Sequence, residues 1–299
     1  MSLQGKANIL MVIVTIFWGV SYTFMRMGLE SLTTYNIVAW RCSIAFIISG
    51  LIFYKRMKNI DAKMLAYAGV QGFLLFAVFS LSLFGLQTTS VSNAGFILSL
   101  TVVIVPIFSS LLERRLPSSA VSIAVVCTMI GITTLTLKDS LSFQPGDILV
   151  AIAAVAYSIY LILNSNFTKS VDSIAYGVYQ LGLAALFGII SMFLFETPAM
   201  PQNSISWIAI LGLGLICTAF CFIAQSVVQQ YTSPTHTGLI FSLEPIFAAL
   251  FAILFIDEPF TLKLLAGGAF ILAGNLVVQL EQFHQTRFLR KVNTHEKTA

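Results

Sequence analysis

The sequence predicts an all-α polytopic membrane protein, in which ten transmembrane helices form two inverted five-helix repeats. Three observations predict this fold class: a very apolar composition, ten hydrophobic segments of membrane-spanning length, and an internal repeat that aligns without a gap. Hydrophobic residues make up 58% of the 299 residues and charged residues only 9%, whereas soluble domains carry roughly 25% charged residues. A soluble fold of this length could not bury so much apolar surface, so a lipid bilayer is the expected surrounding.

The hydrophobic segments set the number of spans. A helix needs about 20 mainly apolar residues to cross the hydrocarbon core of a bilayer. The first apolar run exceeds the roughly 7–15 residues of a signal-peptide core, so it is interpreted as a span and not as a cleavable signal. The predicted spans are 7–26, 34–54, 64–86, 91–112, 118–137, 147–167, 173–195, 205–228, 235–256 and 261–281.

Lysine and arginine residues predict the orientation of these spans. One set of loops, together with both ends of the chain, holds most of them, whereas the opposite loops hold only Arg26, Lys138 and Lys263. Because basic residues favour the cytoplasmic side, both termini are expected in the cytoplasm of a bacterial-type plasma membrane, as an even number of spans requires. The net charge of +4 is dispersed along the chain, so nucleic acid is not an expected partner.

An internal repeat explains the architecture. The segment 88–119 aligns with 231–262 without a gap, so that Gly95 meets Gly238 and the pair Ser99-Leu100 meets Ser242-Leu243. Five spans is an odd number, so the two copies must enter the membrane from opposite sides. Inverted repeats of this kind are common in secondary transporters, whose substrate site lies between the halves near the midplane. The expected units are residues 1–140, residues 141–282 and a polar cytoplasmic tail, 283–299.

Several stretches resemble a known family. "FWGVSYTFMR" (17–26), "AWRCSIAFIISG" (39–50) and "SLEPIFAALFAILFIDEPFT" (242–261) look like the EamA repeats of the drug/metabolite transporter superfamily. The resemblance covers nearly the whole chain, and it implies a ten-helix exporter of small metabolites or drugs. It also implies a cavity between spans 1–4 and 6–9, with spans five and ten at the periphery. It does not fix the substrate.

Glu244 and Pro245 interrupt the apolar run of span nine, where the first repeat has Thr101-Val102. A carboxylate at this depth costs about 2.5–3.5 kcal/mol, so it should face the interior of the bundle. It is interpreted first as a structural or gating group beside a kink at Pro245. Proton coupling and binding of a substrate amine are the alternatives.

Arg41, in "VAWRCS", is the basic residue placed within a span. Its guanidinium could bind a substrate carboxylate through two parallel hydrogen bonds. It could equally be the counter-charge of Glu244, or extend to the outer surface. With one acidic and one basic group inside the membrane, a zwitterion could be held at both ends. His236, at the start of span nine, is expected to meet a polar requirement of the helix start, with a proton relay as the alternative.

Aromatic and polar residues supply the remaining cavity candidates. Trp18 and Tyr22 suit an aromatic belt at the membrane interface, although Trp18 lies deep enough to form a wall against an apolar substrate. Tyr157, Tyr160 and Asn164 form a stripe at i, i+3 and i+7, which suits either a cavity lining or hydrogen bonds between helices. The glutamines of the spans are expected to join helices first and to contact substrate second; they are Gln71, Gln180 and Gln225.

The motifs that would indicate an enzyme are missing from the sequence. It contains no Walker A loop, HExxH or GxSxG motif, and its four cysteines lie in apolar segments without metal-ligand spacing. Neither catalytic residues nor a metal or cofactor are therefore expected. Glu258, next to Pro259, is expected to cap the helix that follows it.

The expected function is a secondary transporter of small organic metabolites such as amino acids, outward by alternating access and driven by protons or passive. The alternatives are efflux of lipophilic cations and a non-transporting receptor or scaffold. The expected partners are a small-molecule substrate and the bilayer, and the expected state is a monomer or a weak homodimer.

Overall fold

The computed structural model describes residues 3–58, 60–112, 114, 116–136, 144–228 and 241–296, with side chains between residues 9 and 281 except residue 279. Every regular element in these ranges is helical. In chain order the helices are α1 (Leu3–Gly28), α2 (Thr34–Phe53), η1 (Arg56–Lys58), α3 (Ala62–Leu86), α4 (Val91–Leu98), α5 (Thr101–Leu112), α6 (Ser119–Thr136), α7 (Pro145–Phe167), α8 (Ser173–Phe195), α9 (Ser204–Leu211), η2 (Gly212–Phe220), α10 (Cys221–Val228), α12 (Glu244–Phe255) and α13 (Leu262–Glu296).

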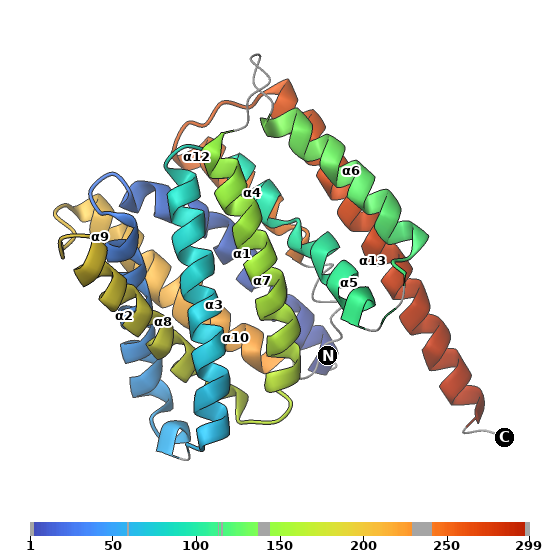
Figure 1. Ribbon diagram of the computed structural model, residues 1–299, viewed down its shortest axis with the longest axis horizontal. Coiled ribbons are helices and arrows are strands. Elements are labelled where there is room, and N and C mark those ends of the chain that lie inside the picture. The colour runs from blue at the N-terminus through green and yellow to red at the C-terminus, as the bar shows by residue number, and fades with distance from the viewer. Residues whose placement is uncertain are drawn as a thin grey trace.

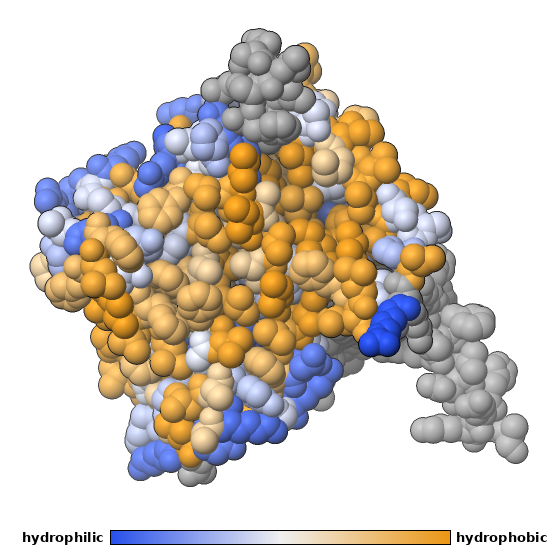
Figure 2. Space-filling model, in the orientation of Figure 1, coloured by the Kyte–Doolittle hydropathy of each residue, from blue (hydrophilic) through white to orange (hydrophobic). Residues whose placement is uncertain are grey.

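The helices have the length and composition of membrane spans. Within the described ranges, seven helical stretches are long and apolar enough to cross a bilayer, and three shorter apolar helices match the predicted spans five, nine and ten. The visible face of the molecule is apolar over its middle, and hydrophilic residues gather toward two opposite ends (Figure 2). This is the surface that a bilayer requires, and it confirms the predicted fold class, while the number of ten spans stays a prediction.

Helices α6 and α13 lie side by side along one edge of the bundle (Figure 1). Small residues let these two helices approach closely, because a Cβ atom on Gly131 would lie 2.7 Å from the carbonyl oxygen of Gly267. Close approach of this kind is the usual means of helix association in membranes, where hydrophobic burial gives little driving force. The position of this pair at the edge of the bundle (Figure 1) agrees with the family resemblance, which places spans five and ten at the periphery.

Both repeats contain a turn at the same pair of aligned residues. The first repeat is interrupted at Ser99-Leu100, between α4 and α5, and the second turns at Ser242-Leu243, just before α12. Pro245 occupies the first turn of α12, where its missing N–H costs nothing. Pro245 thus lies at a helix start, and the turn before it occurs in both repeats, including the one without a proline at this place. The kink of the whole span stays a prediction, because the preceding residues are outside the described ranges.

A π-helical segment interrupts the span formed by α9 and α10. This segment, η2, covers Gly212–Phe220 and packs against α1 and α2. Its glycines permit the contact: a Cβ atom on Gly214 would lie 2.9 Å from the Ile44 side chain and 3.3 Å from the Arg41 carbonyl oxygen. π-helical turns shift side chains out of the α-helical register and occur often at functional sites, which makes the residues of η2 candidates for a functional role.

Two glutamates of the second half cap helices of the first half. Glu258 accepts hydrogen bonds from the backbone N–H groups of Val91 and Ser92 at the start of α4, at 3.1–3.3 Å. Glu196, after α8, accepts hydrogen bonds at the start of α2. The expectation that Glu258 caps the helix after it was therefore wrong in the choice of helix, because the folded chain brings α4 to the end of α12.

An exposed ion pair joins the start of α8 to η1. Asp172 caps α8 by accepting from the backbone N–H groups of Ile174 and Ala175 at 3.0 Å, and Arg56 lies 2.9 Å from its carboxylate. Burial alone would raise the pKa of this carboxyl, but the N–H group of Ala175 and the Arg56 guanidinium lower it below its ordinary value. The pair joins η1 of the first half to α8 of the second.

Candidate functional site

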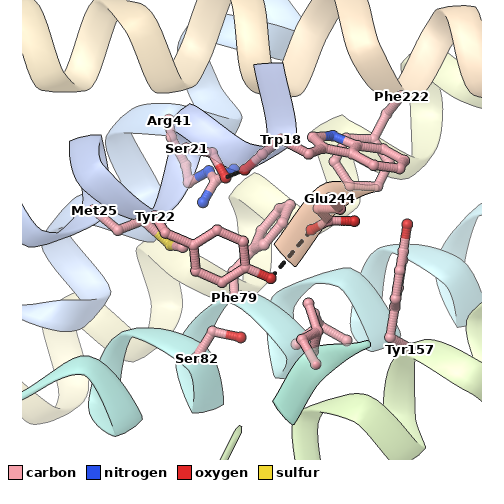
Figure 3. Close-up of a pocket in the computed structure, with 12 residues that line it drawn as sticks. Trp18, Ser21, Tyr22, Met25, Arg41, Phe79, Ser82, Tyr157, Phe222 and Glu244 are labelled. Carbon is pink, nitrogen blue, oxygen red and sulfur yellow. Dashed lines mark hydrogen bonds between the residues drawn. The ribbon is translucent and has the colours of Figure 1, made fainter. Parts of the chain in front are cut away.

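A small cavity lies where helices of both halves meet (Figure 3). The space open to the centre of a water molecule is about 40 Å³. An organic solute needs more room than this, so the side chains of the wall would have to move apart to admit one. The lining residues come from α1, α2, α3 and α4 in one half and from α7, α10 and α12 in the other; they are Trp18, Ser21, Tyr22, Met25, Arg41, Val78, Phe79, Ser82, Leu98, Tyr157, Phe222 and Glu244.

Aromatic side chains form much of the wall. The Trp18 ring lies 6.3 Å from the Tyr157 ring and 5.3 Å from the Phe222 ring, measured between ring centres. The Trp18 indole N–H donates to the carbonyl oxygen of Cys217 in η2, at 3.2 Å. This hydrogen bond satisfies the one polar group of the indole and fixes the ring against the second half of the molecule.

Arg41 brings a cationic group to the cavity. The residue is only 2% exposed, and its guanidinium carbon lies 3.8 Å above the centre of the Phe79 ring. Its Nε–H and an Nη2–H both donate to the hydroxyl oxygen of Thr218 in η2, at 3.1 and 3.0 Å. A guanidinium is weakly hydrated and stacks on aromatic faces, which makes this one of the few surroundings in which a buried cation is tolerable.

Glu244 brings an anionic group to the same cavity. It is the first residue of α12, where the partial positive charge of a helix N-terminus favours a carboxylate. The Tyr22 hydroxyl donates to its Oε1 atom at 3.2 Å, as Figure 3 shows. No carboxylate of the described residues lies within 4.0 Å of Arg41, so Arg41 and Glu244 share a cavity without forming an ion pair.

The other predicted site residues fall into two groups. Trp18, Tyr22 and Tyr157 line the cavity together with Arg41 and Glu244. The polar residues of α3, α7 and α8 instead bond to one another across helices: Gln71 donates to the Tyr160 carbonyl oxygen at 3.1 Å, the Tyr160 hydroxyl to Gln180 at 3.3 Å, and the Tyr176 hydroxyl to Asn164 at 3.0 Å.

Two predicted positions lie outside the cavity wall, and the structure does not describe a third. Gln225 is fully buried in α10 but does not line the space. Pro245 follows the lining residue Glu244 in the first turn of α12. His236 lies outside the described residues. Fewer of the predicted residues line the cavity in this conformation than the sequence suggested. Substrate contact by the buried amides stays a prediction.

Sequence reasoning missed part of the wall. Ser21 and Met25 continue a helical stripe that begins with Trp18 and Tyr22, at i, i+3, i+4 and i+7, and this spacing was available in the sequence. Phe79, by contrast, is one of 25 phenylalanines, and no local pattern distinguishes it. Pairing across the two halves becomes visible only in the fold.

Comparison with known proteins decides the family. The model of the EamA-like transporter family matches the chain twice, over residues 5–137 and 144–280. The chain belongs to the EamA-like transporter family. The two matches follow each other along the chain, as expected of a protein with two EamA repeats.

Relatives of this family member span nearly its full length. An uncharacterized transporter from Archaeoglobus fulgidus is 23% identical over 298 residues, which cover 95% of this chain and 100% of the relative. The uncharacterized transporter YoaV from Bacillus subtilis is 20% identical and covers 87% of this chain and 92% of its own. A crystal structure with a TM-score of 0.70 and 17% identity covers 92% of this chain and 97% of its own, which supports the fold alone. The protein is thus a multi-pass membrane transporter.

Proposed function

We propose that the protein is a secondary transporter that carries small organic metabolites out of the cell by alternating access. One observation carries this proposal: two opposite charges, Arg41 and Glu244, line a single cavity between the halves without pairing. Each charge inside a membrane is costly. A pair of such charges that do not neutralise each other is best explained if a solute supplies the missing partners.

The charges favour a zwitterionic solute such as an amino acid. A carboxylate would meet the guanidinium of Arg41, and an ammonium group would meet the carboxylate of Glu244. The aromatic rings of Trp18, Phe79 and Phe222 would then face the apolar part of the solute. The solute would supply the charged partners that Arg41 and Glu244 lack in this structure. A transporter can bind a polar molecule inside an apolar bundle in this way.

Movement between the halves would expose this site to each side in turn. The turns at Ser99-Leu100 and Ser242-Leu243 lie beside the cavity residues Leu98 and Glu244. The first of them would allow α4 and α5 to tilt separately. Glu244 is also the group that would carry a proton, because it faces the cavity and bonds to Tyr22. Proton coupling would follow if solute and proton compete for this carboxylate.

The expected setting completes the proposal. The distribution of Lys and Arg favours a cytoplasmic membrane with both termini in the cytoplasm. The two repeats, residues 1–140 and 141–282, would be the moving units, followed by a polar tail at 283–299. A monomer is sufficient for this mechanism, because one chain supplies both halves of the cavity.

A lipophilic cation is the second candidate substrate. Trp18, Tyr157 and Phe222 present aromatic rings beside the carboxylate of Glu244. Aromatic faces attract cations, so an aromatic box with one carboxylate would bind an organic cation without the help of Arg41. The two candidates therefore differ in whether Arg41 contributes.

Uptake into proteoliposomes separates the candidates. Purified protein is reconstituted with and without a pH gradient and is offered L-amino acids, their amides, and tetraphenylphosphonium. We expect saturable transport of an amino acid, and we expect Arg41→Gln to raise its KM about tenfold or more without changing that of the amide, which lacks the carboxylate.

Lys58→Gln removes an exposed positive charge and is the matched control, for which no change is expected. Transport of cations alone, unaffected by Arg41→Gln, would reject the zwitterion and favour the second candidate. Absence of transport for every solute, with a correctly folded protein, would reject the transporter proposal for these substrate classes.

A further inference from the structure

Arg41 is held by one residue of the opposite half. The Thr218 hydroxyl oxygen accepts hydrogen bonds from both the Nε–H and an Nη2–H of Arg41, at 3.1 and 3.0 Å. A guanidinium has five N–H donors, so two are engaged by Thr218 and none of the other three bonds to a described residue. Phe79 covers one face of the group. The guanidinium is thus fixed along one edge and one face, and its remaining donors are free to bind.

The position of Thr218 depends on the π-helical segment. Thr218 and its neighbour Cys217 both lie in η2, and both contact the first half: Thr218 holds Arg41, and the Cys217 carbonyl oxygen accepts from Trp18. The Cys217 thiol also lies 3.2 Å from the carbonyl oxygen of Phe17. A π-helical turn carries more residues than an α-helical one, so these two neighbours reach cavity residues on two different helices, α1 and α2.

Without this hold, Arg41 would have a competing partner. Glu244 lines the same cavity, and opposite charges in a surrounding of low dielectric constant attract each other strongly. In Figure 3 the Arg41 guanidinium and the Glu244 carboxylate reach the same space, and the Tyr22 hydroxyl donates to Glu244. Thr218 therefore holds the guanidinium, and Tyr22 holds the carboxylate.

We propose that Thr218 is a positioning residue that holds Arg41 away from Glu244 and so reserves the guanidinium for the carboxylate of a solute. This inference rests on the proposed function, because it assigns a solute carboxylate to Arg41. Loss of the hydroxyl allows Arg41 to turn toward Glu244 and form an internal ion pair. The resulting variant binds solutes with a carboxylate more weakly, whereas solutes without one lose little.

Equilibrium binding to the purified full-length protein tests the role of Thr218. The probes are a radiolabelled L-amino acid, identified as a ligand of the wild type, and its amide. Thr218→Val keeps the shape of the side chain and removes the hydroxyl, whereas Thr218→Ser keeps the hydroxyl. We expect Thr218→Val to raise the Kd of the amino acid about tenfold and that of the amide less than twofold, and we expect Thr218→Ser to resemble the wild type. Thr218→Ala serves as a second variant without the hydroxyl if Thr218→Val does not fold.

A second substitution separates positioning from mere structure. In the double variant Thr218→Val, Glu244→Gln the competing carboxylate is neutral, so its affinity for the amino acid should equal that of Glu244→Gln alone. An equal loss for amino acid and amide in Thr218→Val, or a further loss in the double variant relative to Glu244→Gln, would overturn the role of Thr218 while the transporter stands. Failure of the wild type to bind any amino acid would instead reject the zwitterion that the inference requires.

Discussion

Glu196→Ala should destabilise the protein by removing the cap of α2. The carboxylate of Glu196 accepts from the Thr33 hydroxyl at 2.5 Å, from the backbone N–H groups of Tyr35 and Asn36 at 3.1 and 3.0 Å, and from the Asn36 side-chain amide at 3.1 Å. Thr33, the residue just before α2, makes no capping hydrogen bond of its own. Glu196 therefore takes the place of the missing cap from a distant part of the chain.

The expected loss follows from two contributions. Removal of a helix cap costs about 0.5–2 kcal/mol, and removal of a negative charge at a helix N-terminus costs a further 0.3–1 kcal/mol or so. Together they amount to about 2 kcal/mol, which corresponds to a fall in melting temperature of roughly 4–8 °C. Glu196→Gln keeps one acceptor oxygen and should lose about half as much.

The buried cysteines provide the assay. Cys42, Cys217 and Cys221 are free and buried, so a thiol-reactive fluorophore reports thermal unfolding of the purified protein in detergent. Glu30→Ala makes the same chemical change at an exposed residue and should melt with the wild type. A melting temperature of Glu196→Ala within about 1 °C of that of Glu30→Ala would refute the reasoning.

Two further substitutions test packing and pH dependence with the same assay. Gly72→Ala should cost about 1–3 kcal/mol, because its Cβ atom would lie 2.8 Å from that of Leu183, whereas Gly69→Ala on the same helix comes no closer than 3.9 Å and should leave stability unchanged. Asp172→Asn should lower the melting temperature at neutral pH, since the folded state lowers the pKa of this carboxyl through Arg56 and the start of α8. That contribution is present above the unfolded pKa and is lost as the pH falls through the lowered folded pKa, so variant and wild type should converge below about pH 4; a constant difference at all pH values would contradict it.

The sequence was most informative where a residue was costly in its place. Arg41 and Glu244 stand out because an ionisable group in an apolar span requires a special surrounding, and both line the cavity. The aromatic residues Trp18 and Tyr157 were both expected as cavity candidates, and their ring centres lie 6.3 Å apart in the cavity wall.

Polarity alone did not predict the direction in which a side chain faces. Gln71 and Gln180 are as costly to bury in a helix interface as in a cavity wall, so the sequence leaves both possibilities open, and the fold uses them between helices. Thr218 carried no local signal, and the local signal of Glu258, its place next to Pro259, predicted the wrong helix. Their partners lie 177 and more than 160 residues away, and one of them depends on a π-helical turn that residue patterns do not reveal.

The size of the cavity has a consequence for the choice of cargo. The space open to the centre of a water molecule is about 40 Å³, so an organic solute can enter only if side chains of the wall move apart. The free energy for this movement must come from the contacts that the solute makes. Small inert molecules would therefore be poor cargo, even though they would need the least room.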